Sequence, residues 1–196
     1  MTESLLHHVR VVLFEPQDPV NIAATVRAMK NMGVRDLVLV RPVEYTSYRL
    51  EGIAHDTLDI IERIRDVDTL DDALADCVHV AAFTARRRRH KWDLSTPREM
   101  AERLLTRVAD GTVAILFGRE DHGLPNEASD RAHTLVTIPT TNHASLNLAQ
   151  AVLVALYELH LAAGDATLVG RFVLMEQIGA GSFGEVWRAH DGLLDR

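Results

Sequence analysis

The chain has 196 residues, of which 47% are hydrophobic and 25% are charged, and its formal net charge is −7. This balance is ordinary for a soluble globular protein, and the length suits one well-buried domain with some chain left over. The acidic charge argues against an indiscriminate nucleic-acid binder, and no apolar run is long enough to span a bilayer.

The chain begins without the apolar core of a secretion signal. Its single cysteine, Cys77, excludes an internal disulfide and is predicted to be a small core residue. We therefore expect a cytoplasmic protein that does not associate with a membrane.

Apolar, β-branched runs alternate with helical patterns along the chain. The runs predict buried strands at residues 9–14, 37–40, 78–83, 113–117 and 135–138. Helices are predicted at residues 21–32, 57–65, 70–75 and 97–109, with a polar connection at residues 45–50. Gly33 ends the first helix, and Thr96, Pro97 and Glu99 form a capping box with proline at the first helical position. The alternation predicts an α/β fold, with a mostly parallel sheet flanked by helices.

A long last helix is predicted by the apolar 3.6-residue period of residues 146–163. The positions on this period are Leu146, Ala149, Val152, Leu153, Leu156 and Leu159. Small polar residues stand where the helix begins, in the order Ser145-Leu146-Asn147. Ser145 can cap the unpaired N–H groups of the helix start, and the loop before it can surround a ligand. Either role accounts for the composition of this segment.

Polar loops follow four of the predicted strands, at residues 15–21, 84–91, 118–124 and 139–145. In a parallel sheet the carboxyl ends of the strands share one edge, and ligands bind just beyond that edge. Loops gathered there predict a binding site in preference to independent surface turns.

The residue types give little support to two kinds of hydrolysis. The ten histidines are scattered, without H-E-x-x-H or a Cys/His cluster, so we expect no metal. Ser145 lacks the G-x-S-x-G surroundings of a serine hydrolase nucleophile. His122 and His143 lie in loops of the predicted site but receive no role. Arg27 stands on a small, apolar helix, where it either pairs with an acid or serves the site.

Three blocks of the sequence resemble the SpoU family of RNA ribose 2′-O-methyltransferases, within the SPOUT class. They are residues 21–33 (NIAATVRAMKNMG), residues 116–124 (LFGREDHGL), and Ile138-Pro139 followed by residues 145–152 (SLNLAQAV). Their order and spacing also match, and the resemblance covers about residues 9–160. The first and third blocks are most similar to the TrmJ branch, which methylates tRNA in the anticodon loop, at a site of the position-32 type.

The resemblance implies a C-terminal trefoil knot, a homodimer, and S-adenosyl-L-methionine bound in the knot. The implied cofactor-binding residues are Phe83, Thr84, Ala85, Gly118, Ile138, Ser145, Leu146 and Asn147. The implied catalytic residues are Arg27, Asn21, Glu120, Ser145 and Asn147. Arg27 matches the arginine proposed to help deprotonate the ribose hydroxyl. Because an arginine is normally fully protonated, it acts either as a strongly perturbed base or by orienting the hydroxyl and a neighbouring phosphate.

Two positions depart from the family pattern, and a basic run follows one of them. Ala23 stands where family members usually show glycine, and Phe83 replaces the threonine of a usual Thr-Ser-Ala-Arg loop. The residues that follow this loop predict RNA phosphate contacts, with a solvated loop as the alternative; they are Arg86, Arg87, Arg88, Arg89 and Lys91.

The last part of the chain has a different character. We expect a methyltransferase domain at residues 1–164 and a tail at residues 165–196. The tail resembles the start of a protein-kinase domain, because Gly179, Gly181, Gly184 and Val186 form its G-x-G-x-x-G-x-V pattern. No lysine follows, and neither H-R-D nor D-F-G occurs, so we predict no kinase activity. A β-hairpin or a mobile tail are both compatible with this segment.

The leading hypothesis from the sequence is an S-adenosylmethionine-dependent tRNA 2′-O-methyltransferase. The alternative is a non-catalytic RNA-binding or regulatory protein that retains the fold. A third interpretation, a regulatory module linked to a kinase, requires a kinase body that this sequence lacks.

Overall fold

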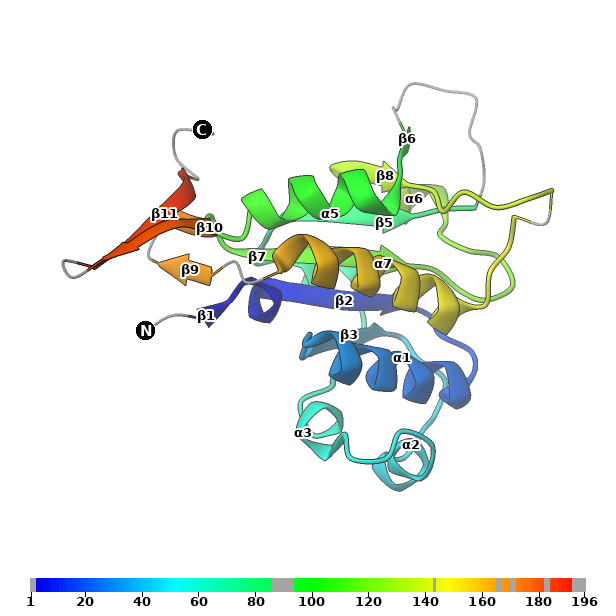
Figure 1. Ribbon diagram of the computed structural model, residues 1–196. Helices are drawn as coiled ribbons and strands as arrows, with labels where there is room; N and C mark the ends of the chain where they lie inside the picture. Colours follow the sequence, from blue (N-terminus) through cyan, green and yellow to red (C-terminus); the bar gives the residue numbers. More distant parts are fainter. Residues whose placement is uncertain are drawn as a thin grey trace.

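A sheet of seven parallel strands forms the centre of the computed structural model (Figure 1), which describes residues 3–85, 94–142, 144–164, 167–169, 172–181 and 184–191. The strands are β2 (Val9–Phe14), β3 (Asp36–Val40), β4 (Arg65–Val67), β5 (Cys77–Phe83), β6 (Leu94–Ser95), β7 (Thr112–Phe117) and β8 (Thr134–Val136). Their order is β4-β3-β2-β7-β5-β8-β6, and neighbouring strands pair parallel throughout. The predicted fold class is therefore confirmed.

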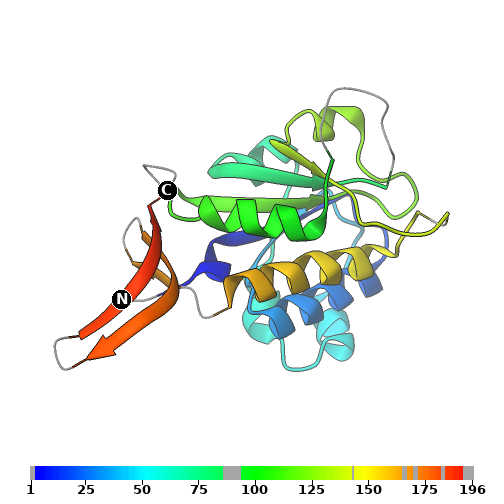
Figure 2. The ribbon, with the colours of Figure 1, turned by 45° about the horizontal axis from the view of Figure 1, so that its top comes forward.

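Helices cover both faces of this sheet. They are α1 (Pro19–Met32), α2 (Ser47–Ile53), α3 (Leu58–Ile61), α4 (Leu70–Leu74), α5 (Pro97–Thr106), α6 (Asn126–Ser129) and α7 (Leu148–Ala163), and a short 3₁₀ helix, η1 (Leu5–His8), precedes β2. Side chains of α1, α5 and α7 pack in one core cluster, and those of α4 and α6 pack in the other. Figures 1 and 2 show α7 lying between α1 and α5 on one face.

Strand β2 shows why the strand sequences are rich in consecutive apolar residues. Its alternate residues Val9, Val11 and Leu13 join one core cluster, whereas Val12 and Phe14 join the other. A strand covered on both faces has no solvent side, so apolar residues lie on both faces rather than at every second position. Arg10 is the exception in β2.

The structure corrects the sequence prediction between the second and third predicted strands. Residues 47–53 form α2, capped by Thr46, rather than a polar connection. The predicted helix at residues 57–65 shortens to α3 and is followed by β4, a strand whose side chains are mostly exposed. Strand β4 is held through its backbone pairing with β3, so it carries no hydrophobic pattern by which it could have been predicted.

The start of the last helix also differs from the prediction. Asn147, not Ser145, caps α7, because its side-chain oxygen accepts a hydrogen bond from the backbone N–H of Gln150 at 3.3 Å. Leu146 therefore precedes the helix. Leu153, one of the apolar positions on the predicted helical period, is 41% exposed. By contrast, the capping box of Thr96 and Glu99 at the start of α5 is confirmed.

Strand β8 lies between two parts of one chain segment. Thr84 N donates to Val136 O on one side, and Thr137 N donates to Ser95 O on the other, each at 2.9 Å. The two ends of the segment from β5 to β6 thus flank the chain that leads to α7. The trefoil knot stays a prediction, because residues 86–93 of this segment lie outside the described part.

The tail forms a second sheet with the beginning of the chain. Strands β1 (Glu3–Ser4), β9 (Thr167–Val169), β10 (Phe172–Gly181) and β11 (Gly184–Asp191) pair antiparallel in that order. Of the two alternatives, β10 and β11 form the hairpin. Val173 of β10 is 1% exposed and packs in the main core cluster. The division of the chain at residue 164 stays a proposal. No helix in the described part of the chain combines the length and apolarity of a membrane span.

A buried arginine ties together the amino ends of three strands. Arg10 of β2 is 4% exposed and donates to Asp36 Oδ2 at 2.6 Å, to Asp76 at 2.5 and 2.9 Å, and to the carbonyl of Ala73 at 2.9 Å. Burial acts to lower the pKa of Arg10, but the hydrogen bonds to the two carboxylates outweigh it and raise that pKa. Burial also raises the pKa of the neighbouring Cys77 thiol to about 11, so this thiol remains protonated and packs as a partly buried core residue.

Replacing Arg10 by methionine is expected to lower the free energy of unfolding by about 3 kcal/mol, because the buried carbonyl of Ala73 and the carboxylates of Asp36 and Asp76 lose their shared donor. Urea unfolding followed by circular dichroism measures the change. Arg65→Met is the matched control: Arg65 also pairs with Asp36, at 3.0 Å, but it is 47% exposed and should contribute less than about 1 kcal/mol. Equal losses in the two variants would contradict this account of the arginine.

Candidate functional site

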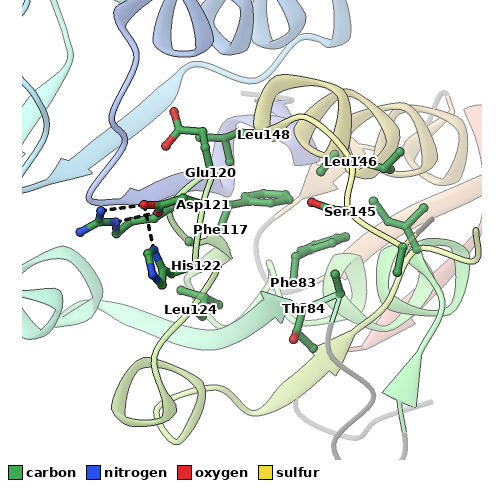
Figure 3. A pocket seen from close by; sticks show the side chains of 17 residues that line it. Phe83, Thr84, Phe117, Glu120, Asp121, His122, Leu124, Ser145, Leu146 and Leu148 are labelled. Atoms are coloured by element: carbon green, nitrogen blue, oxygen red, sulfur yellow. Dashed lines mark hydrogen bonds and ion pairs between the residues drawn. The ribbon is translucent and has the colours of Figure 1, made fainter. Parts of the chain in front are cut away.

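A cavity of about 270 Å³ lies beyond the carboxyl ends of β5, β7 and β8 (Figure 3). This volume is near the lower end of the range for small-molecule sites, roughly 300–1,000 Å³. Most of the predicted cofactor residues line it, namely Phe83, Thr84, Ala85, Gly118, Ile138, Ser145 and Leu146. Asn147, the remaining predicted cofactor residue, is not part of this lining. The sheet edge thus brings together loops that are far apart in the sequence.

The loop after β7 can form only with glycine at position 118. A Cβ atom there would lie 2.2 Å from the carbonyl carbon of Gly123 and 2.3 Å from Leu124 N. The loop closes on itself through a hydrogen bond from Gly123 N to Arg119 O at 2.9 Å, and Gly123 has a φ of +67°. The two glycines therefore allow the backbone to form a compact wall of the cavity.

Stacked aromatic rings form an apolar part of the same wall. The rings of Phe83 and Phe117 lie with their centroids 4.4 Å apart and their planes inclined by 19°. Figure 3 shows the Phe117 ring between Glu120 and Ser145, and the Phe83 ring beside Ser145 and Thr84. Phe83 is the residue that departs from the family loop, and this contact gives it a packing role beside the cavity.

Three of the predicted catalytic residues form one hydrogen-bond chain. Asn147 Nδ2 donates to Asn21 Oδ1 at 2.8 Å, and Asn21 Nδ2 donates to Glu120 Oε1 at 2.9 Å. The carboxylate of Glu120 also accepts from the backbone N–H groups of Gln17 at 2.9 Å and Asp18 at 3.2 Å. This chain joins the starts of α1 and α7 to the loop after β7. Ser145 lies apart from it, on the cavity wall.

Arg27 lies outside this constellation. Its side chain is exposed, and its Nη1 donates to the backbone oxygen of His55 at 2.5 Å. It is not among the residues that line the cavity. The structure therefore does not bring Arg27 to the cavity within one chain. The predicted RNA-contact residues Arg86, Arg87, Arg88, Arg89 and Lys91 lie outside the described residues, as does His143.

A chain of charged groups at the cavity rim was missed in the sequence. Arg119 Nε and Nη2 each donate to one oxygen of Asp121 at 3.0 Å, and Asp121 Oδ2 lies 2.8 Å from His122 Nδ1. The Arg119 guanidinium, and then His122, hold the pKa of the Asp121 carboxyl well below its usual range. The only sequence signal for this chain was that its three residues stand close together in the loop of Gly118 and Gly123. No periodicity distinguishes these residues from a solvated turn.

The fold and the cavity define a class: an α/β protein that binds a small ligand at the carboxyl edge of a parallel sheet, between two glycine-containing turns and the start of a long helix. The chain belongs to the SpoU rRNA Methylase family, whose model matches residues 8–157.

Named relatives and solved structures are similar to this chain. It is 37% identical over 208 residues to the tRNA (cytidine/uridine-2′-O-)-methyltransferase TrmJ of Sodalis glossinidius, with 97% of this chain and 81% of that protein covered. It is 44% identical over 160 residues to the tRNA (cytidine/uridine/adenosine-2′-O-)-methyltransferase TrmJ of Pseudomonas aeruginosa. That match covers 81% of this chain but 62% of the relative, so the chain spans about three fifths of its length.

Solved structures of methylase family proteins are also similar to this chain. A probable methylase family protein from Haemophilus influenzae superposes with a TM-score of 0.74 at 38% identity, covering 81% of this chain and 67% of that one. TrmJ from Z. mobilis superposes with a TM-score of 0.71 at 35% identity, covering 78% and 68% of the two chains.

Gly118→Ala is expected to lower the free energy of unfolding by about 2 kcal/mol, because its Cβ would meet backbone atoms that cannot rotate away. Gly52→Ala is the control: a Cβ at Gly52 in α2 would have nothing within 4 Å, and alanine should stabilise the helix slightly. Urea unfolding of both variants measures the difference. An unchanged unfolding midpoint for Gly118→Ala would show that the loop can open without cost.

Proposed function

We propose that this protein transfers a methyl group from S-adenosylmethionine to a ribose 2′-oxygen in the anticodon loop of tRNA. The observation that carries the proposal is the cavity at the carboxyl edge of the sheet, where the predicted cofactor residues other than Asn147 come together. The names of the relatives, which are tRNA 2′-O-methyltransferases at 37% and 44% identity, support the same reaction and substrate.

The residues that line the cavity fit S-adenosylmethionine. Apolar side chains offer a slot for a flat adenine ring, and they are Phe83, Phe117, Leu124, Ile138 and Leu146. The compact loop at Gly118 brings backbone groups to this slot, and backbone N–H and C=O groups can bind adenine and the methionine part without a metal. Among the described residues, no group of His, Cys, Asp and Glu side chains is arranged to hold a metal ion. When bound, the cofactor supplies an electrophilic methyl group.

The hydrogen-bond chain beside the cavity would position the substrate. Glu120, Asn21 and Asn147 are fixed by one another and by the start of α1, so they move little when a ligand arrives. Ser145 presents a hydroxyl on the cavity wall and can contact the ribose. Holding the attacking oxygen in line with the methyl group is the main contribution that such fixed groups make to transfer.

A homodimer is part of the proposal, because one face of the molecule exposes an apolar stripe. Leu153, Tyr157 and Leu161, spaced four residues apart on α7, are 41%, 48% and 51% exposed, and Val20 of the adjacent α1 is 45% exposed. Such a stripe is typical of a helix that packs against another chain. Arg27 is exposed on α1 as well, so a dimer through this face could place its guanidinium at the interface.

Methyl transfer from labelled S-adenosylmethionine to unmodified tRNA tests the proposed function. We expect ribose 2′-O-methylation by the parent protein and a loss of about 100-fold in rate for Arg27→Ala, the magnitude typical of a removed transition-state contact. Arg63→Ala, another exposed arginine, is the control and should leave the rate unchanged. No transfer to any tRNA, with no binding of S-adenosylhomocysteine, would favour a non-catalytic RNA-binding protein instead.

The double variant Tyr157→Asp, Leu161→Asp is expected to be monomeric, whereas the parent protein should sediment as a dimer. Charged side chains on the stripe would have to be desolvated in the interface, which is costly. Tyr48→Asp is the matched control, because Tyr48 is 87% exposed on α2 and should not affect assembly. Sedimentation velocity distinguishes the species. A dimer that persists in the double variant would exclude this face.

A further inference from the structure

A second cavity, of about 630 Å³, lies at the same carboxyl edge of the sheet, beyond the ends of β3 and β4. Its walls come from the segment that follows β3 and from the end of β4 with the turn after it. The volume lies within the range of small-molecule sites. No site residue predicted from the sequence lines this cavity, and the transfer of a methyl group at the first cavity gives it no role.

The polar side chains of the second cavity favour a ligand that carries N–H groups. Glu44, Asp66 and Asp68 line it with carboxylates, and among the described lining residues Arg41 is the only basic one. No other described residue bonds to or pairs with the side chain of Glu44 or Asp68, so their oxygens remain able to accept. Ionised carboxylates accept hydrogen bonds but cannot donate them, and they repel a phosphate.

Tyr45 holds one of these carboxylates in a fixed position. Its hydroxyl donates to Asp66 Oδ1 at 2.8 Å. Burial, and then this hydrogen bond, raise the pKa of the Tyr45 phenol, so the hydroxyl keeps its proton at neutral pH. Asp66 is thus oriented before a ligand arrives, which reduces the entropy that binding would cost.

The guanidinium of Arg41 forms a flat, fixed wall of the cavity. Its Nε and Nη2 donate to Glu15 Oε1 at 2.9 and 2.6 Å, and its Nη1 donates to the carbonyl of Asp68 at 3.1 Å. Its Cζ lies over the ring of Phe14, 5.1 Å from the centroid. A guanidinium plane is a surface on which RNA bases stack. Because Glu15 balances its charge, Arg41 does not draw a phosphate into the cavity.

Glu15 also connects the second cavity with the first. One of its oxygens accepts from Arg41, and the other lies 3.5 Å from Nη1 of Arg119, which lines the first cavity. These residues follow β3, β2 and β7, which are neighbours in the sheet. At a strand spacing of about 4.8 Å, the ends of β3 and β7 lie about 10 Å apart. A nucleotide close to the methylated one can therefore reach the second cavity.

We propose that the second cavity binds an unpaired RNA base with an amino group, close in the same loop to the nucleotide whose ribose is methylated. We call it the base pocket, formed by Arg41, Glu44, Tyr45, Asp66 and Asp68. The inference rests on the proposed methyl transfer and adds a further contact with its substrate. Proteins reach the edges of RNA bases mainly in single-stranded loops. Guanine, adenine and cytosine offer an N–H₂ donor to the carboxylates, whereas uracil does not.

The first test measures the dissociation constant of unmodified tRNA by fluorescence anisotropy, with S-adenosylhomocysteine present. Removing carboxylates normally strengthens RNA binding, because the phosphates are repelled less. The base pocket predicts the opposite sign: the double variant Glu44→Gln, Asp68→Asn should raise Kd by about ten-fold, since charged acceptors are lost. Its affinity for S-adenosylhomocysteine and its urea unfolding midpoint should not change.

The matched control is the double variant Glu51→Gln, Glu62→Gln, which removes the same charge from α2 and the end of α3, outside the base pocket. Its Kd for tRNA should stay the same or fall. Tighter or unchanged binding by the base-pocket variant as well would overturn the proposal.

The second test locates the base that is bound. In a set of tRNA transcripts, each amino-bearing base of the loop, other than that of the methylated nucleotide, is replaced in turn by uracil. One replacement should raise Kd for the parent protein by about ten-fold and should have no further effect on the base-pocket variant, which is the coupling expected of groups in contact. A purely structural effect of the variant would add to every replacement equally and would overturn the proposal.

The remaining outcomes separate this inference from the proposed function. Methyl transfer by the parent without any such coupling would overturn the base pocket alone. Coupling in Kd without methyl transfer to any tRNA would overturn the proposed function and leave the base pocket as an RNA contact. A parent that does not bind tRNA would overturn both. Thermal stabilisation of the parent, but not of the base-pocket variant, by spermidine without any coupling would assign the cavity to a free organic cation instead.

Discussion

The site is organised by the carboxylate of Glu120, which holds the loop after β7 against the start of α1. It accepts hydrogen bonds from Gln17 N, Asp18 N and Asn21 Nδ2. The start of a helix presents unpaired N–H groups and a partial positive charge, so an ionised carboxylate is stabilised there. Because Asn21 also bonds to Asn147, the same contact fixes the start of α7. Three segments of the chain, separated by as many as 126 residues, therefore share one geometry.

The ion-pair cluster that stabilises the sheet and the loops that line the cavity lie at opposite edges of the sheet. Arg10, Asp36 and Asp76 join the amino ends of the strands in a tightly bonded cluster. At the carboxyl edge the backbone has positive φ at Glu15, Arg41 and Gly123. Such conformations are tolerated where the surrounding structure fixes them, and they are common at functional sites.

The sequence predicted the elements that carry a repeating pattern. Strands such as β2 carry apolar residues on both faces because both faces are covered, and the capping box at Thr96 and Glu99 has a fixed spacing. Strand β4 was missed because its pairing with β3 uses backbone groups, which leave no mark on side-chain composition. The three-block resemblance located the cavity walls. It could not place Arg27, whose contact with His55 O depends on how α2 and α3 pack beside α1.

His122 shows why the rim was the hardest part to predict. A single histidine in a polar loop is usually solvated, and only the tertiary contacts among Arg119, Asp121 and His122 give it an orientation.

The tail lies away from all of this chemistry. In Figures 1 and 2 the sheet of β1 and β9–β11 stands beyond the amino ends of the central strands, opposite the loops that line the cavity. It is joined to the main body by the pairing of β1 with β9 and by Val173, which packs in the main core cluster. Substitutions in β10 or β11 should thus act through the stability of that junction, because neither strand contributes to the cavity lining. The glycine-rich pattern of the tail is accordingly independent of the site proposed for methyl transfer.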